Sequence, residues 1–201
     1  MKSHSGSQVD LKTPARPSAS PVRAVFLVGF MGAGKTTVGK ALSHDLGWPF
    51  EDLDDRLQKR EDRTVEQIFR ESGEAAFRRA ETSALRELLD ELGTTPRVVA
   101  LGGGAFVQPE NAELVQRPDV TSVFLDGPVE ELFRRCDKQQ IERPLRGSLE
   151  QFQQLHQVRL PHYLTAKLRI DTASKDVEAV ANELRRKLAI AQEDSGAGHE
   201  I

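Results

Sequence analysis

The chain has 201 residues, of which 38% are hydrophobic and 29% charged, and its formal net charge is −3. Since domains average roughly 150 residues, this length predicts one domain, and it is long enough for an α/β domain with a core. The composition is that of a soluble protein, and the charge shows no basic excess that would favour nucleic acid as a partner. The single cysteine excludes an intramolecular disulfide, the scattered histidines argue against structural zinc, and no apolar run approaches the roughly 20 residues of a membrane-spanning helix.

The first segment, residues 1–23, is rich in Ser and Pro and lacks the apolar core of a secretory signal, so a disordered tail is expected. A short organelle transit peptide is the alternative, because Asp10 is the only acidic residue there. Residues 24–190 are expected to form the folded domain, and the polar residues 191–201 a flexible C-terminal tail. These features together predict a cytoplasmic protein.

The apolar run at residues 24–28 predicts a strand buried on both faces of a parallel sheet. Apolar residues at helical spacing follow from Thr36, and Gly47 is expected to end that helix. A short second strand is expected at 48–52. The segment Thr64–Gln67 has the pattern of a capping box and predicts the start of another helix.

The rest of the chain continues this alternation. Further strands are expected at 97–101, 121–125 and 168–170, and further helices at about 74–92, 109 onward, 128–135, 155–164 and 177–188. Residues 137–148 are polar and lack a hydrophobic period, which predicts a long loop acting as a mobile lid. Alternating strands and helices predict an α/β fold whose parallel sheet is covered on both sides and binds its ligand at the carboxyl ends of the strands.

The loop after the first strand has the pattern G-x-x-x-x-G-K-[ST], supplied by Gly29, Gly34, Lys35 and Thr36. Glycines let the backbone point N–H groups at phosphate oxygens, the lysine reaches the β- and γ-phosphates, and the hydroxyl binds Mg²⁺. A flexible glycine turn is the simpler alternative. The position between a buried strand and a helix favours binding of a purine nucleoside triphosphate.

Two carboxylates, Asp52 and Asp54, stand at the end of the second expected strand. In extended geometry side chains two residues apart point the same way, so both are expected to face the crevice beside the phosphate loop. One could hold the Mg²⁺ shell and the other could accept a proton from an attacking hydroxyl. A solvated acidic turn is the alternative, since Glu51 and Asp55 flank the pair.

Four further segments are candidates for binding the phosphate acceptor or the transferring phosphate. Gly102, Gly103 and Gly104 follow an expected strand and leave bare backbone that a small ligand can approach. Arg143 lies in the expected lid among other basic residues, where it could close over transferring phosphate. Arg78 and Arg159 are individually compatible with ordinary surface charge.

In combination these segments resemble the shikimate kinases over residues 24–188. The matching motifs occur in order as GFMGAGKTT at 29–37, DLD at 52–54, FRRAE at 77–81, LGGGA at 101–105, RPL at 143–145 and RLPHY at 159–163. The resemblance implies a three-layer P-loop NTPase fold with a five-stranded parallel sheet. It also implies transfer of the γ-phosphate of ATP to the 3-hydroxyl of shikimate, with Mg²⁺, on the route to chorismate and the aromatic amino acids. A monomer without nucleic-acid or membrane partners is expected.

The resemblance also implies roles for individual residues. Lys35, Asp54 and Arg143 would be catalytic, and Thr36 would bind the metal together with Asp52, which acts through water. The ATP site would comprise Gly32, Ala33, Gly34, Lys35, Thr36, Thr37, Arg135 and Arg143. The shikimate site would comprise Asp54, Arg78, Gly102, Gly103, Gly104 and Arg159, the two arginines clamping the substrate carboxylate.

Three alternatives stay open. A generic P-loop interpretation takes Asp126, at the end of the strand 121–125, as the metal ligand in place of Asp52. A kinase for another small molecule, such as gluconate, would share the phosphate loop but has no evident need for the two-arginine clamp. A non-catalytic module of the same fold would be expected to lose a lid or acid residue, and all of these are present.

Overall fold

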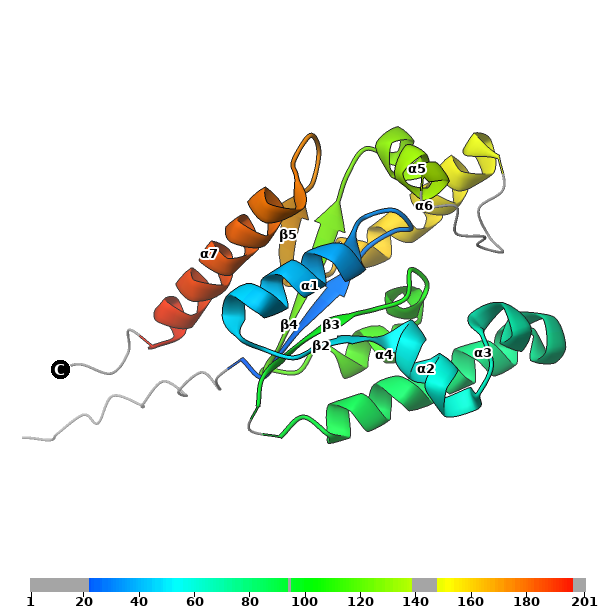
Figure 1. Ribbon diagram of the computed structural model, residues 1–201, viewed down its shortest axis with the longest axis horizontal. Coiled ribbons are helices and arrows are strands. Elements are labelled where there is room, and N and C mark those ends of the chain that lie inside the picture. The colour runs from blue at the N-terminus through cyan, green and yellow to red at the C-terminus, as the bar shows by residue number, and fades with distance from the viewer. Residues whose placement is uncertain (1–21, 94, 139–147, 197–201) are drawn as a thin grey trace, which may run out of the picture.

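A computed structural model describes residues 22–93, 95–138 and 148–196 (Figure 1). At its centre lies a five-stranded parallel sheet in the order β2-β3-β1-β4-β5. The strands are β1 (Ala24–Val28), β2 (Phe50–Asp52), β3 (Arg97–Ala100), β4 (Val120–Asp126) and β5 (Leu168–Asp171). The α/β fold with a five-stranded parallel sheet is therefore confirmed.

Strand β1 is the central strand and explains the continuous apolar run at its position. All five of its residues are buried, and Leu27 lies in register with Ala100 on one side and Val123 on the other. Because the chain passes from β3 to β4 across β1, the strand order reverses here. Such a reversal leaves a crevice at the carboxyl end of β1, where open α/β sheets bind their ligands.

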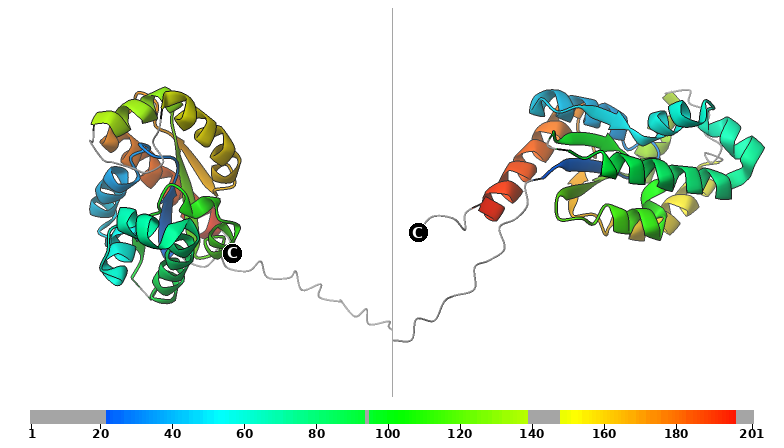
Figure 2. Two further views of the ribbon diagram at one scale, coloured as in Figure 1. Left: turned by 90° about the vertical axis from the view of Figure 1, so that its right-hand side faces the viewer. Right: turned by 90° about the horizontal axis from the view of Figure 1, so that it is seen from below.

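Helices cover both faces of the sheet. Helix α1 (Lys35–Leu46) packs against α7 (Val177–Gly196) on one face, and α4 (Pro109–Leu114) and α6 (Leu149–Tyr163) lie on the other, as the two views of Figure 2 show. Helix α5 (Val129–Lys138) packs against α6, and a short 3₁₀ turn, η1 (Ala105–Val107), precedes α4. These are the three layers expected from the alternating pattern.

Helices α2 (Leu53–Glu61) and α3 (Val65–Asp90) pack together, and α2 with the first half of α3 projects beyond the carboxyl ends of the strands (Figure 1). The capping box is confirmed, because the Thr64 hydroxyl accepts from the Gln67 amide at 3.1 Å and the Gln67 side chain accepts from the Thr64 amide at 2.7 Å. The two helices expected on either side of Gly73 form one helical stretch, kinked where Gly73 has φ 77°.

Three expectations need correction. Helix α2 was not expected, and it means that Asp54 belongs to the first helical turn rather than to an extended strand. Helix α7 continues to Gly196, into the segment expected to be a C-terminal tail. The second strand begins at Phe50 rather than at Trp48, because the Pro49 ring removes a backbone donor before the strand. In the part of the chain that the structure describes, none of the helices has the length and apolar composition of a membrane span.

Candidate active site

The phosphate loop is shaped by glycines that cannot be replaced without collision. Gly29 and Gly32 have φ values of 143° and 77°, which side-chain-bearing residues rarely adopt. A Cβ atom would stand 2.7 Å from the Leu125 carbonyl oxygen at Gly29, and 2.3 Å from the Leu132 carbonyl oxygen at Gly32. The loop is therefore packed directly on the backbone of β4 and α5.

Lys35 begins α1, and its side chain folds back over the loop. The Nζ atom donates to the carbonyl oxygens of Gly29 at 2.9 Å and Phe30 at 3.0 Å, and the residue is only 9% exposed. Ala33 is buried and Gly34 caps the helix in the left-handed conformation, while Thr36 and Thr37 are exposed. The ammonium group and the N-terminal end of α1 thus concentrate positive charge at the loop.

Thr36 and Asp52 bring two oxygen donors together at the carboxyl end of the sheet. The Thr36 hydroxyl donates to the Asp52 carboxylate at 2.8 Å, and the other Asp52 oxygen accepts from the Asp54 amide at 3.1 Å. Asp52 is consequently the N-cap of α2. The cap turns the chain so that Asp54 still reaches the same cavity, although by helical rather than extended geometry.

A cavity of about 470 Å³ joins the phosphate loop to the acceptor candidates. Five of the segments singled out in the sequence contribute to its lining, through Thr36, Asp52, Asp54, Arg78, Gly102–Gly104 and Arg159. Val65, Phe69 and Phe77, from the two halves of α3, form an apolar wall. The cavity therefore pairs charged groups with an apolar surface, as sites for small molecules commonly do.

The three glycines allow charged side chains to lie against the backbone. A Cβ atom on Gly104 would stand 2.6 Å from both terminal nitrogens of Arg78, and one on Gly102 would stand 2.6 Å from an Asp54 carboxylate oxygen. Arg159 approaches from α6, is 7% exposed, and donates from Nη1 to the Gly103 carbonyl at 3.3 Å. Arg79, next to Arg78, is exposed.

Glu81 is a buried member of the site that the sequence analysis does not single out. It is 1% exposed, and Arg78 Nη1 donates to its carboxylate at 2.9 Å. Burial raises the pKa of Glu81 to about 7, although the charge of Arg78 opposes that rise. Glu81 lies three residues after Arg78, and this helical spacing within FRRAE is the sequence feature that could have indicated their pairing.

Tyr163 is a second unassigned member and lies four residues after Arg159 on α6. Its hydroxyl donates to the Gly103 carbonyl, and its ring stacks on Phe124 with centroids 5.3 Å apart. Burial raises the pKa of Tyr163 to about 12, so the hydroxyl stays protonated as a donor. Arg159 and Tyr163 together fix the central glycine of the turn.

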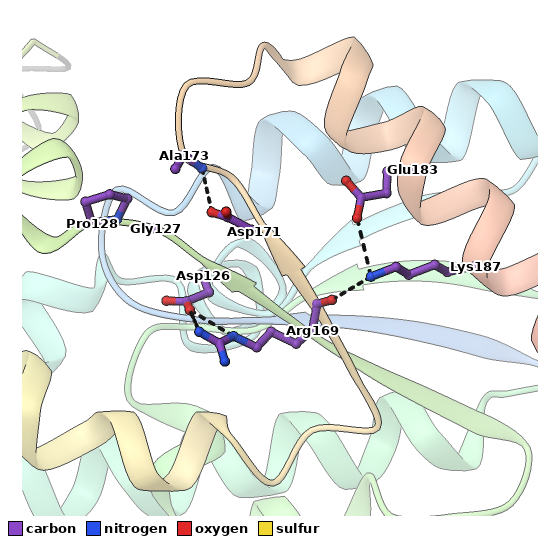
Figure 3. A pocket seen from close by; sticks show the side chains of 8 residues that line it. All are labelled: Asp126, Gly127, Pro128, Arg169, Asp171, Ala173, Glu183 and Lys187. Atoms are coloured by element: carbon purple, nitrogen blue, oxygen red, sulfur yellow. Dashed lines mark hydrogen bonds and ion pairs between the residues drawn. The ribbon is translucent and has the colours of Figure 1, made fainter.

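Asp126 occupies a different environment from Asp52. Its carboxylate accepts from Arg169 Nε at 2.9 Å and from a second nitrogen of the same guanidinium, in a pocket beside β5 (Figure 3). On the opposite side of that pocket Lys187 pairs with Glu183 and donates to the Arg169 carbonyl (Figure 3). Asp126 thus forms an ion pair with Arg169, whereas Asp52 accepts a hydrogen bond from the hydroxyl of Thr36 in the phosphate loop.

Of the two remaining arginine candidates, the structure describes Arg135 but not Arg143. Arg135 on α5 donates to Glu131 at 2.6 Å and to the Thr172 carbonyl at 3.2 Å, which places its guanidinium beside the β5–α7 connection. Arg143 and most of the expected lid lie outside the described residues. Within the described part of the chain, no group of three or more His, Cys, Asp or Glu side chains could hold a metal ion by itself.

Comparison with known proteins gives one consistent result. A model of the shikimate kinase family matches residues 31–189. A shikimate kinase of Geobacter sulfurreducens is 42% identical over 165 residues, covering 81% of this chain and 88% of the relative. One of Persephonella marina is 38% identical over 164 residues, covering 81% and 97% respectively.

A solved structure agrees with these relatives. The shikimate kinase from Acinetobacter baumannii in complex with shikimate superposes with a TM-score of 0.77 at 33% identity, over 85% of this chain and 95% of that one. The residues matched by the family model, 31–189, include Thr36 of the phosphate loop and the segments that line the cavity.

Proposed function

The chain belongs to the shikimate kinase family, and from this premise we propose that it transfers the γ-phosphate of ATP to the 3-hydroxyl of shikimate, giving ADP and shikimate 3-phosphate. One observation carries the proposal. The phosphate-loop residue Thr36 and the acceptor candidates Asp54, Arg78 and Arg159 line the same cavity. Donor and acceptor can therefore meet in one space.

On the donor side, Lys35 supplies positive charge to the β- and γ-phosphates. Its Nζ is already held at the loop by the Gly29 and Phe30 carbonyls, so the side chain is ordered before a nucleotide arrives. The loop amides from Gly32 to Thr37 surround the phosphates. Preorganised charge of this kind stabilises the transition state, in which negative charge spreads over the phosphoryl oxygens.

The donor set also fits Mg²⁺. Thr36 and Asp52 present a hydroxyl and a carboxylate 2.8 Å apart, which are the hard oxygen ligands that Mg²⁺ prefers. Mg²⁺ usually keeps several waters and takes one or two protein ligands together with phosphate oxygens, so a larger cluster of acidic residues is not required. Thr36 would bind the ion directly and Asp52 through water. When bound, the ion neutralises phosphate charge and helps to orient the γ-phosphate.

On the acceptor side, Arg78 and Arg159 hold the substrate carboxylate from two different helices. Guanidinium groups present paired donors that match a carboxylate, and both side chains are largely shielded from water. Glu81 fixes one arginine by accepting its 2.9 Å hydrogen bond, and the Gly103 carbonyl fixes the other. The glycine turn leaves room for the ring.

Asp54 orients and activates the attacking hydroxyl. The hydroxyl oxygen forms a bond to the γ-phosphorus, its proton passes to the Asp54 carboxylate, and the bond from phosphorus to the β-phosphate oxygen breaks with the electron pair leaving on ADP. Arg143 is proposed to neutralise the transferring phosphate from the lid, and Arg135 to lie against adenine. The Arg143 assignment comes from the RPL motif, and the Arg135 assignment from the general resemblance to the family.

The rival small-molecule kinase is separated by its acceptor. We expect ADP release, measured with coupled enzymes, to depend on shikimate and to show no comparable rate with gluconate at equal concentration. Turnover with gluconate and none with shikimate would contradict the proposal. A chain that binds both ligands without forming ADP would instead be a non-catalytic module of the same fold.

A further inference from the structure

Phe30 belongs to the phosphate loop, yet its side chain enters the acceptor half of the molecule. The ring is completely buried and meets α6 edge-on, with its centroid 4.7 Å from that of Phe152 and 5.2 Å from that of His156. One turn further along the same helix, the Cζ atom of Arg159 lies over the ring, 5.8 Å from the centroid. The ring thus forms part of the support beneath this arginine.

The main chain of Phe30 serves the donor half instead. Its carbonyl oxygen accepts the Lys35 ammonium at 3.0 Å. One residue therefore contacts the lysine of the nucleotide site through its backbone and the arginine of the acceptor site through its side chain. Replacing the side chain leaves the carbonyl in place, so the two contacts can be tested separately.

Arg159 needs such support because its side chain is long and has several rotatable bonds. The described residues hold its guanidinium by a 3.3 Å hydrogen bond to Gly103, by the electrostatic influence of neighbouring charges and by the face of Phe30. An aromatic face attracts a guanidinium within about 6 Å of its centroid, and the attraction is larger where water is displaced. A flat face below the group also limits its orientation.

We propose that Phe30 is a positioning residue for the acceptor, which acts by holding Arg159 in the orientation that receives the substrate carboxylate. This inference rests on the proposed function, since it assigns the carboxylate of shikimate to Arg159. It makes a residue of the phosphate loop a determinant of acceptor affinity. Binding of the nucleotide depends on the Phe30 carbonyl and is only weakly affected by the ring.

The test compares Phe30→Leu with wild type and with Phe152→Leu. Leucine keeps the site apolar but removes the aromatic face, so KM for shikimate should rise about tenfold, the change that corresponds to about 1.4 kcal/mol. KM for ATP should change less than twofold. Phe152→Leu removes an equally buried ring that packs on Phe30, and it serves as the control for general repacking. A similar rise in both variants, or a rise mainly in KM for ATP, would overturn the inference.

A double-mutant cycle with Arg159→Ala separates positioning from loss of stability. If Phe30 acts through Arg159, Phe30→Leu should raise KM for shikimate in the wild type but add less than twofold in the Arg159→Ala background. Equal effects in both backgrounds would refute the role. Absence of shikimate-dependent ADP release in wild type would refute the proposed function itself, whereas normal wild-type turnover with an unaffected Phe30→Leu variant would refute only this inference.

Discussion

Replacing Glu81 by glutamine should change how stability depends on pH, because this carboxyl group is buried in the site. The residue is 1% exposed, and burial raises its pKa from the ordinary 4.5 to about 7 despite the 2.9 Å contact with Arg78. The folded protein therefore binds the Glu81 proton more tightly than the unfolded chain does. Glutamine has nearly the same shape but does not titrate.

The sign and size of the effect follow from that difference in pKa. Below pH 4.5 the carboxyl is protonated in both states, and above about pH 7 it is ionised in both. Between these values the native state retains the proton, so the free energy of unfolding of the wild type falls as pH rises. At 1.36 kcal/mol for each pKa unit, the fall amounts to about 3 kcal/mol. This is a large share of the roughly 5–15 kcal/mol that stabilises a typical domain.

The assay is urea unfolding of wild type and Glu81→Gln at several pH values from 4.5 to 8. Subtracting the free energies of unfolding of the two proteins cancels the titration of all other groups. As pH rises from 4.5 to 8, the variant should become more stable relative to the wild type by about 3 kcal/mol. Glu74→Gln is the matched control, because Glu74 also pairs with Arg78, at 3.3 Å, but its side chain is 62% exposed. A flat difference for Glu81→Gln, or a slope of opposite sign, would refute the reasoning.

Three further predictions concern substrate binding and turnover. Arg159→Ala should raise KM for shikimate at least tenfold, because a charge-assisted hydrogen bond contributes about 1.5–3 kcal/mol; unchanged shikimate kinetics would remove Arg159 from the clamp. Arg143→Ala should lower kcat while ATP binding, measured by calorimetry, largely survives, and an unaltered kcat would refute its lid role. Gly104→Ala should weaken shikimate binding, because the new Cβ would stand 2.6 Å from Arg78, whereas Gly93→Ala, with its nearest neighbour at 4.0 Å, should bind normally.

The nucleotide half could be predicted from sequence because its determinants are local. The strand, the glycines and the lysine lie within about a dozen consecutive residues, and each has a fixed structural role. Gly47 likewise ends α1 in the left-handed conformation, as its position after the last helical residue indicated. The sheet followed from alternating strands and helices, since parallel strands require crossover helices.

Helix α2 was missed because its sequence is short and polar. Leu53 and Leu57 are its two fully buried residues, and two positions four residues apart do not establish a helical period. Asp52 ends β2, as expected, but it is also the N-cap of α2, a position that aspartate favours. Asp52 and Asp54 both face the cavity, as expected, because the N-cap turns Asp54 toward it.

The burial of the supporting residues of the acceptor site could not be found by local reasoning. The spacing of Arg78 and Glu81 on one helix indicates their pairing, but not that Glu81 is buried. The partner of Tyr163 becomes evident only when α6 and the Gly103 turn are brought together. Phe30 posed the same difficulty, because its place in a phosphate-loop motif gave no indication that its ring packs on α6. Burial and long-range packing decide such roles.

The central claim is tested most directly by identifying the product. Wild-type protein incubated with ATP, Mg²⁺ and shikimate should form ADP and shikimate 3-phosphate in equal amounts, with the phosphate on the 3-hydroxyl as shown by phosphorus–proton correlation in NMR. Lys35→Ala should form neither product. ADP formed at the same rate without shikimate, or phosphate found on another acceptor while shikimate is unchanged, would contradict the account.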